Sequence, residues 1–177
     1  KNIKGLVLTH AHLDHIGSLK HILPALGMPI LYGTKLTLGL AKKSIEEAGL
    51  LQYTTFVEID SESGKEFKIG EFSCEFFNVN HSIPDSAGIY LSSPGGAKFV
   101  HTGDFKIDHT PYIDKPADLD RISKIGDRGI TMLLSDSTGS SQKGFSASEK
   151  GVGEVLEEII INHKKGRLII AAFSSWI

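Results

Sequence analysis

The sequence has a single cysteine, Cys74, among its 177 residues. No disulfide can form within the chain, and a metal site built from several thiolates is excluded. No apolar run approaches the roughly 20 residues that a membrane-spanning helix needs, and no signal peptide is recognisable. We therefore expect a cytoplasmic protein that has no membrane partner.

Charge is nearly balanced, with 19 Lys and Arg against 21 Asp and Glu. This balance does not indicate a nucleic-acid-binding protein and does not exclude one, because a basic groove can coexist with an acidic remainder. A hydrophobic content of 40% is typical of a globular protein of about one domain. The chain starts without methionine and stops directly after an apolar run, so we expect a piece of a longer protein.

Strand and helix patterns alternate along the first third of the chain. Residues 3–9 form a branched apolar run typical of a buried strand, and apolar residues recur at helical spacing over 16–26. Residues 29–32 predict a second strand, and 38–48 predict an amphipathic helix that Gly49 ends. This order is typical of an α/β fold.

Short strands dominate after Thr54, separated by Gly, Ser, Pro or Asp. A loop-rich stretch at 103–128 includes an expected helix at 119–125. The sequence has no internal repeat and no low-complexity tract. The expected strands are 54–60, 65–69, 71–79, 87–92, 97–102 and 131–135.

The last part of the chain predicts one helix and one strand. Ser146 and Glu149 have the spacing of a capping box ahead of apolar residues at 152–160, so we expect Ser146 to begin a helix. Residues 167–173 predict a final strand. The Gly/Ser-rich stretch 137–148 is the best candidate for a domain junction.

The strongest functional signal is the run THAHLDH, which follows the first expected strand. Strand side chains repeat every two residues, so His10 and His12 project to the same side. The turn that follows brings Asp14 and His15 to an adjacent position. Imidazole and carboxylate ligands suit zinc, with manganese or iron as alternatives. A polar loop with coincidental histidines is the alternative, but three histidines in six residues have no packing role.

Two later motifs place further ligand types at the ends of expected strands. His81 follows the strand 71–79 in the segment NHSIPD, and Asp104 follows the strand 97–102 in the segment TGDF. Folds of the α/β type gather their sites at strand ends. Taken alone, His81 fits a surface or capping histidine and Asp104 fits a turn former. Beside the first motif, both become candidate ligands.

The motif HAHLDH, the lone histidine and TGDF together resemble the metallo-β-lactamase superfamily, whose signature is H-x-H-x-D-H. THAHLDHIG, NHSIPDSAGIY, VHTGDFKID and LLSDST resemble more narrowly its β-CASP branch, and within that branch the ribonuclease J family. The resemblance runs from Ile3 to Phe173. It implies an α/β fold of the metallo-β-lactamase-like αββα type over residues 1–135, in which the N-terminal strands are missing. Residues 136–177 would then be the beginning of a truncated β-CASP domain.

Carried over by position, the family pattern implies a site for two zinc ions, with manganese as an alternative. The pattern assigns His10, His12 and His81 to one ion. It assigns Asp14 and His15 to the other. The same resemblance implies RNA as the partner, with a 5′ monophosphate, and a homo-oligomer in the full-length protein.

Further positions follow from the same resemblance. Asp104 would bridge both ions, Asp136 in SDST would support the metal cluster, and Ser175 would lie near the bound 5′ end of RNA. The family usually has asparagine where Gly139 and Trp176 stand. The family's final metal histidine and most of its β-CASP domain lie beyond this sequence. We therefore expect weak binding of the second ion and little activity from this piece alone.

The implied reaction is hydrolysis of RNA phosphodiester bonds, by endonuclease and 5′-to-3′ exonuclease action, with a hydroxide activated by two zinc ions. Asp14 is expected to orient or deprotonate this nucleophile while it binds metal. Asp136 could accept the second N–H of a ligating histidine, as carboxylates commonly do beside metal sites.

Two other functions stay open. A different hydrolase of the same fold, acting on an ester, thioester or lactam, would share the metal site, but the 82–85 loop and the β-CASP onset at Asp136 argue against it. A catalytically silent RNA-binding scaffold subunit would normally lose metal ligands, whereas every ligand position within this chain is intact. Surface or capping roles are expected for the remaining histidines, His21, His101, His109 and His163.

Overall fold

The first third of the chain forms a parallel sheet with helical connections. The structure, a computed structural model, describes residues 3–171. Parallel strands need crossover connections, which explains why strands and helices alternate here. The sheet contains, in spatial order, β1 (Gly5–Val7), β2 (Ile30–Gly33) and β3 (Phe56–Glu58). The connections contain α1 (Leu13–Ile16), α2 (Leu19–Leu26), α3 (Lys35–Glu47) and the 3-10 turn η1 (Leu51–Tyr53).

The second sheet has five strands in sequence order, antiparallel except for its last pair, which is parallel. A helix, α4 (Leu119–Gly126), forms the crossover between the two strands of that pair. The strands are β4 (Glu66–Ile69), β5 (Phe72–Asn78), β6 (Ala87–Ser92), β7 (Lys98–His101) and β8 (Met132–Leu134).

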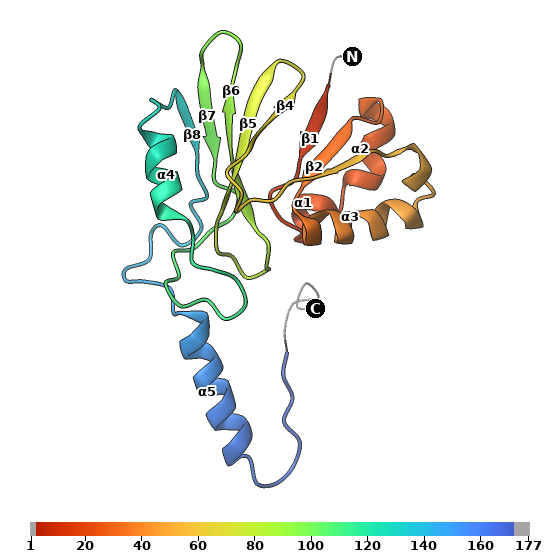
Figure 1. The fold of residues 1–177 in the computed structure, drawn as a ribbon. Coiled ribbons are helices and arrows are strands. Elements are labelled where there is room, and N and C mark those ends of the chain that lie inside the picture. Colours follow the sequence, from red (N-terminus) through yellow and green to blue (C-terminus); the bar gives the residue numbers. More distant parts are fainter. Residues whose placement is uncertain (1–2, 172–177) are drawn as a thin grey trace.

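Three apolar clusters hold four layers together. One fills the space between the first sheet and α1–α3, and includes Leu23, Leu31 and Ile45. In β5, side chains alternate between the other two: Phe76 packs between the sheets, whereas Phe77 packs toward α4. The helices α1–α3 and α4 therefore lie on opposite outer sides of the paired sheets (Figure 1). The predicted αββα fold class is confirmed.

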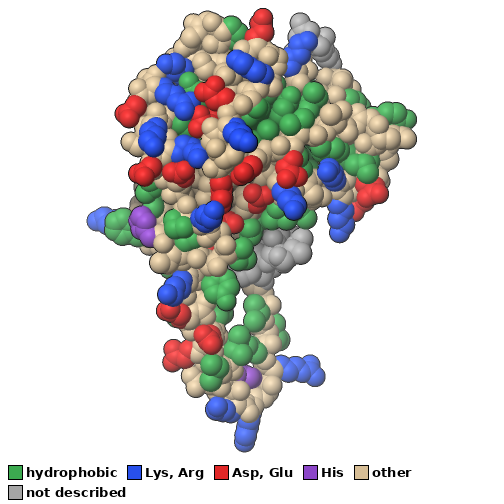
Figure 2. Space-filling view, viewed as in Figure 1, with side chains coloured by type: hydrophobic (Ala, Val, Ile, Leu, Met, Phe, Trp, Pro, Cys, Tyr) green, Lys and Arg blue, Asp and Glu red, His purple; other side chains and the backbone are tan. Residues whose placement is uncertain are grey.

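The helix α5 (Glu149–Asn162) projects from this body (Figure 1), and hydrophobic side chains lie along its segment (Figure 2). Its first turn is capped by a distant loop: the Asp108 carboxylate accepts the Glu149 amide at 2.9 Å. Lys106 lies within 3.2 Å of Asp108 and 2.9 Å of Glu149. The helix begins after Ser148, so the predicted cap at Ser146 is wrong.

Other elements also differ from the prediction, two of them in more than their end residues. The helical region expected over 16–26 begins at Leu13 and is divided into α1 and α2. Helix α2 ends at Leu26, and the next residue, Gly27, has a left-handed φ of 82°. The predicted final strand is wrong for residues 167–171. They pair with no strand in the part of the chain that the structure describes, and their apolar side chains are exposed. The last two residues of the predicted strand lie outside the described part. Within the described residues, no helix is long and apolar enough to cross a membrane.

Candidate metal centre

Six candidate ligands come together from loops that follow strands of both sheets. The segment after β1 carries four of them, two in the loop and two in α1, and the loops after β5 and β7 carry one each. The Ala87 amide donates to the Thr9 carbonyl at 2.9 Å, which ties the first of these loops to the second sheet. The six residues are His10, His12, Asp14, His15, His81 and Asp104.

The first group of ligand atoms consists of one ring nitrogen each from His10, His12 and His81, all within 4.8 Å of one another. The His81 Nε2 atom lies 3.0 Å from the His12 Nδ1 atom. Both of these residues are half-buried, whereas His10 is fully buried. Three imidazoles that face one point form the protein part of a typical zinc site.

The second group consists of His10, His15 and Asp104, again with ligand atoms within 4.8 Å of one another. The Asp104 Oδ2 atom lies 3.4 Å from His15 Nε2, 3.9 Å from His10 Nε2 and 3.8 Å from His81 Nε2. One carboxylate oxygen therefore faces both groups. Asp14 lies at the outer side, where its carboxylate is 3.5 Å from His15 Nε2 and its side chain is 80% exposed.

His10 shows that the donor set fits a metal ion. Its Nδ1 atom is hydrogen-bonded to the Thr9 hydroxyl at 3.1 Å, while its buried Nε2 atom has no hydrogen-bond partner among residues 3–171. A buried polar atom without a partner is costly, and a bound cation would remove that cost. Burial and the neighbouring His15 lower the pKa of His10 to about 3, so the ring is neutral near pH 7 and able to bind metal.

His81 is also biased toward the neutral form. Burial, with the neighbouring His12, lowers its pKa. Neutral imidazole nitrogens together with a carboxylate suit zinc or another transition metal, since a hard cation such as Mg²⁺ prefers oxygen ligands. The residues present therefore fit the predicted metal, and their individual assignments to one ion or the other stay predictions.

A buried asparagine joins the loops that carry His81 and Asp104. The carbonyl of Asn80 accepts the Lys106 amide at 2.8 Å, which links the residue before one ligand to a residue close after the other. The Asn80 side chain donates to the Lys115 carbonyl at 2.8 Å and accepts the Ala117 amide at 2.9 Å. All of these bonds connect segments far apart in sequence.

A second residue of the NHSIPD segment anchors the same loop to α3. The Asp85 carboxylate accepts the Leu36 amide at 2.8 Å, and its carbonyl accepts the Thr34 hydroxyl at 2.7 Å. Asp85 has a φ of 64°, an unusual left-handed conformation for a residue other than glycine. Burial raises the pKa of its carboxyl. Sequence reasoning missed this role, because the motif drew attention only to its histidine.

Asp136 lies against the turn that contains Asp104. Its amide donates to the Thr102 hydroxyl at 3.0 Å, and its carboxylate accepts the Phe105 amide at 3.4 Å and the Thr138 amide at 2.8 Å. The bond from the Thr138 amide is the main reason why the pKa of Asp136 is lowered. The structure thus brings Asp136 to the backbone of this turn. The predicted Ser175 lies outside the described residues.

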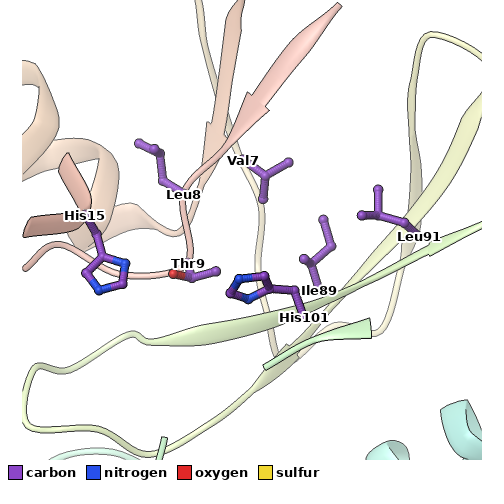
Figure 3. Close-up of a pocket in the computed structure, with 7 residues that line it drawn as sticks. All are labelled: Val7, Leu8, Thr9, His15, Ile89, Leu91 and His101. Atoms are coloured by element: carbon purple, nitrogen blue, oxygen red, sulfur yellow. The ribbon is translucent and has the colours of Figure 1, made fainter. Parts of the chain in front are cut away.

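An open pocket adjoins the centre between the end of β1 and the strands β6 and β7 (Figure 3). His15, one of the candidate ligands, lines it together with Thr9 and His101. His101 was expected to have a surface or capping role, and the structure shows its Nδ1 atom accepting the Gly103 amide at 2.9 Å. The rest of the lining is apolar and consists of Val7, Leu8, Ile89 and Leu91.

Residues 1–123 match the β-lactamase superfamily domain. The chain belongs to the β-lactamase superfamily. Within this superfamily, it is 40% identical over 173 residues to ribonuclease J of Helicobacter pylori and 43% identical over 173 residues to ribonuclease J 1 of Streptococcus pyogenes. Each alignment covers 98% of this chain but only 24% and 30% of those proteins, respectively. The resemblance to ribonuclease J is confirmed, and the chain spans less than a third of these relatives.

Solved structures of the superfamily fold are also similar to this chain. Unliganded yeast PDE1 has a TM-score of 0.57 at 15% identity, covering 92% of this chain and 54% of that one. Zn²⁺-bound PqqB from Methylobacterium extorquens has a TM-score of 0.53 at 14% identity, covering 75% of this chain and 45% of that one. At these identities the similarity shows the shared fold alone.

Proposed function

We propose that the protein containing this chain is a metal-dependent ribonuclease that hydrolyses phosphodiester bonds in RNA. The proposal depends above all on one observation: two groups of ligand atoms share the buried His10 and are both faced by one oxygen of Asp104. Its choice of substrate follows from the similarity to ribonucleases J over 98% of the chain. Zinc is the proposed metal, with manganese as the alternative.

The six candidate ligands would bind two metal ions. His10, His12 and His81 would hold one ion, Asp14 and His15 the other, and Asp104 would bridge them. Two bound ions would supply positive charge for the phosphate oxygens and lower the pKa of an attacking water. Because the lowered pKa values of the buried histidines favour their neutral forms, no deprotonation is needed before they bind near pH 7.

Asp14 is the proposed catalytic residue. Its side chain is 80% exposed, whereas the other ligands are substantially more enclosed, so its carboxylate is open to water and to a substrate phosphate. Its distance of 3.5 Å from His15 Nε2 leaves it within reach of the same ion. There it would orient the attacking water or accept its proton.

The finer features of the activity are proposals that rest on the resemblance. They comprise endonuclease and 5′-to-3′ exonuclease action, preference for a 5′ monophosphate, and assembly into a homo-oligomer. They also include a domain boundary between residues 135 and 136, with a β-CASP domain beginning there and Ser175 near the 5′ end of RNA. The exposed apolar side chains of α5 are compatible with packing against such a domain.

The test is RNA cleavage by the full-length protein. RNAs with a 5′ monophosphate and with a 5′ triphosphate would be incubated with it in zinc or manganese, with His12→Ala as the inactive variant. His21→Ala is the matched control, since His21 lies on α2 away from the ligand groups. We expect metal-dependent cleavage that is lost only in His12→Ala. Cleavage of an ester or lactam instead of RNA would indicate another hydrolase, and RNA binding with less than one metal per chain would indicate a scaffold subunit.

A further inference from the structure

We infer that His101 is a positioning residue of the metal centre, because it holds the turn that presents Asp104. Its Nδ1 atom accepts the amide of Gly103 at 2.9 Å, one residue before the carboxylate that faces both ligand groups. This inference rests on the proposed metal centre. His101 itself belongs to neither ligand group of the described residues.

The turn packs closely against the loop that carries His10. Gly103 is buried and has a φ of 63°, which residues with a side chain rarely adopt. A Cβ atom at this position would lie 3.0 Å from the Thr9 Cβ atom and 3.1 Å from the Ala87 carbonyl oxygen. The turn is therefore packed against Thr9, which directly precedes His10. A shift of the turn would displace Asp104 and would also disturb the backbone next to His10.

Among the hydrogen bonds of the turn, the bond to the Gly103 amide is the one that His101 provides. Backbone and hydroxyl groups hold Thr102, whose amide donates to the Leu134 carbonyl at 3.0 Å and whose hydroxyl donates to the Gly103 carbonyl at 2.7 Å. The Gly103 amide instead donates to the side chain of His101. Without that acceptor, a buried amide would lose its partner, and rotation of the peptide toward water would become favourable.

Rotation of this peptide matters because the next residue is Asp104. Its Oδ2 atom lies 3.4 Å from His15 Nε2 and 3.9 Å from His10 Nε2, so one carboxylate must face both groups at once. Metal ligands have to be held within about 0.5 Å of their working positions. A partner outside the ligand shell that fixes such a ligand typically changes metal affinity by about 10- to 100-fold.

The same hydrogen bond sets the tautomer of His101. A nitrogen that accepts an amide proton cannot carry its own, so the neutral ring has its proton on Nε2. The ring lines the same pocket as Thr9 and His15 (Figure 3). His101 thus has two separable properties, an acceptor at the δ position and a ring that lines the pocket together with Ile89 and Leu91.

Two substitutions separate these properties. His101→Asn keeps an oxygen acceptor at the δ position and removes the ring, whereas His101→Phe keeps a ring and removes the acceptor. The measurement is the zinc affinity of the full-length protein, by competition with a chelator. We expect His101→Phe to lower the zinc affinity of the more weakly binding of the two sites at least about 10-fold. The zinc affinity of His101→Asn should stay within about threefold of the wild-type value. A role in packing alone predicts the opposite order.

Each outcome is decisive. Wild-type affinity in His101→Phe, or a loss in His101→Asn as large as in His101→Phe, would overturn the inference. If His101→Phe does not fold by circular dichroism, His101→Asn decides alone: retained affinity supports the inference and lost affinity refutes it. Absence of zinc binding in the wild-type protein would instead refute the proposed function, so the two failures are distinguishable.

Discussion

Replacing Asn80 by alanine should destabilise the protein, because the Ala117 amide would lose its side-chain acceptor and the Lys115 carbonyl would lose the shorter of its two side-chain donors. The Asn80 side chain is buried and bonds the Lys115 carbonyl at 2.8 Å and the Ala117 amide at 2.9 Å. Leaving a buried donor or acceptor unpaired costs about 1–3 kcal/mol each. The Lys115 carbonyl keeps the Asn78 side-chain amide at 3.3 Å, and Lys115 is exposed, so water can partly replace the lost donor. We therefore expect the free energy of unfolding to fall by about 2 kcal/mol in total, near the low end of this range.

Asn78→Ala is the matched control. Asn78 is also buried and is the last residue of β5, two residues before Asn80, but its side-chain amide lies 3.3 Å from the Lys115 carbonyl and 3.4 Å from the Pro116 carbonyl. Hydrogen bonds of this length are weak, so we expect a loss below about 1 kcal/mol.

Urea unfolding followed by circular dichroism measures both losses. With a denaturant dependence of about 2 kcal/mol per M, Asn80→Ala should lower the midpoint by about 1 M without changing the slope. The reasoning is refuted if Asn80→Ala lies within about 0.5 kcal/mol of wild type, or if Asn78→Ala is the more destabilised variant.

Three further changes have defined outcomes. Asp85→Ala removes the acceptor of the Leu36 amide and places alanine at a φ of 64°. We expect its Tm to fall by about 3–6 °C, whereas Asp85→Asn should retain most of the wild-type Tm. The pKa of His10 is about 3 in the folded protein, against an ordinary value of 6.5 for histidine, so the unfolded chain binds more protons between these pH values. The stability of the metal-free protein should therefore fall as the pH falls through this window, and His10→Gln should flatten the dependence in urea titrations at successive pH values. Asp104→Asn should lower zinc affinity by more than about 10-fold while leaving the metal-free Tm nearly unchanged; unchanged zinc binding would contradict its place between the two groups.

The candidate ligands could be predicted from sequence because their pattern is local. His10 and His12 alternate as strand residues do, and His81 and Asp104 directly follow expected strands. The structure brings them together because those strands end at one edge of the paired sheets. Their shared location follows from the fold class, whereas the roles of individual ligands do not.

The residues that hold the ligand loops could not be predicted, because each acts on a partner far away in sequence. Asp85 accepts an amide 49 residues earlier, and Asn80 donates to a carbonyl 35 residues later. Such pairs depend on loop conformations that no periodic pattern encodes. The start of α5 failed for the same reason, since Asp108 accepts its first amide from 41 residues away.

The final strand shows a different limit of sequence patterns. Residues 167–171 have the apolar, branched composition of a strand, but a strand also needs a neighbour with which its backbone can pair. The described part of the chain offers them none. Local composition therefore predicts that such a segment favours the strand conformation. Whether it forms a strand depends on a neighbouring strand with which it can pair.

The central claim is that the six ligands hold two metal ions. Anomalous X-ray diffraction at the zinc edge, on crystals of the full-length protein grown with zinc, tests it most directly. We expect two peaks, one among His10, His12 and His81 and one beside Asp14 and His15, with Asp104 between them. No peak at these residues, or zinc bound only elsewhere, would contradict the claim.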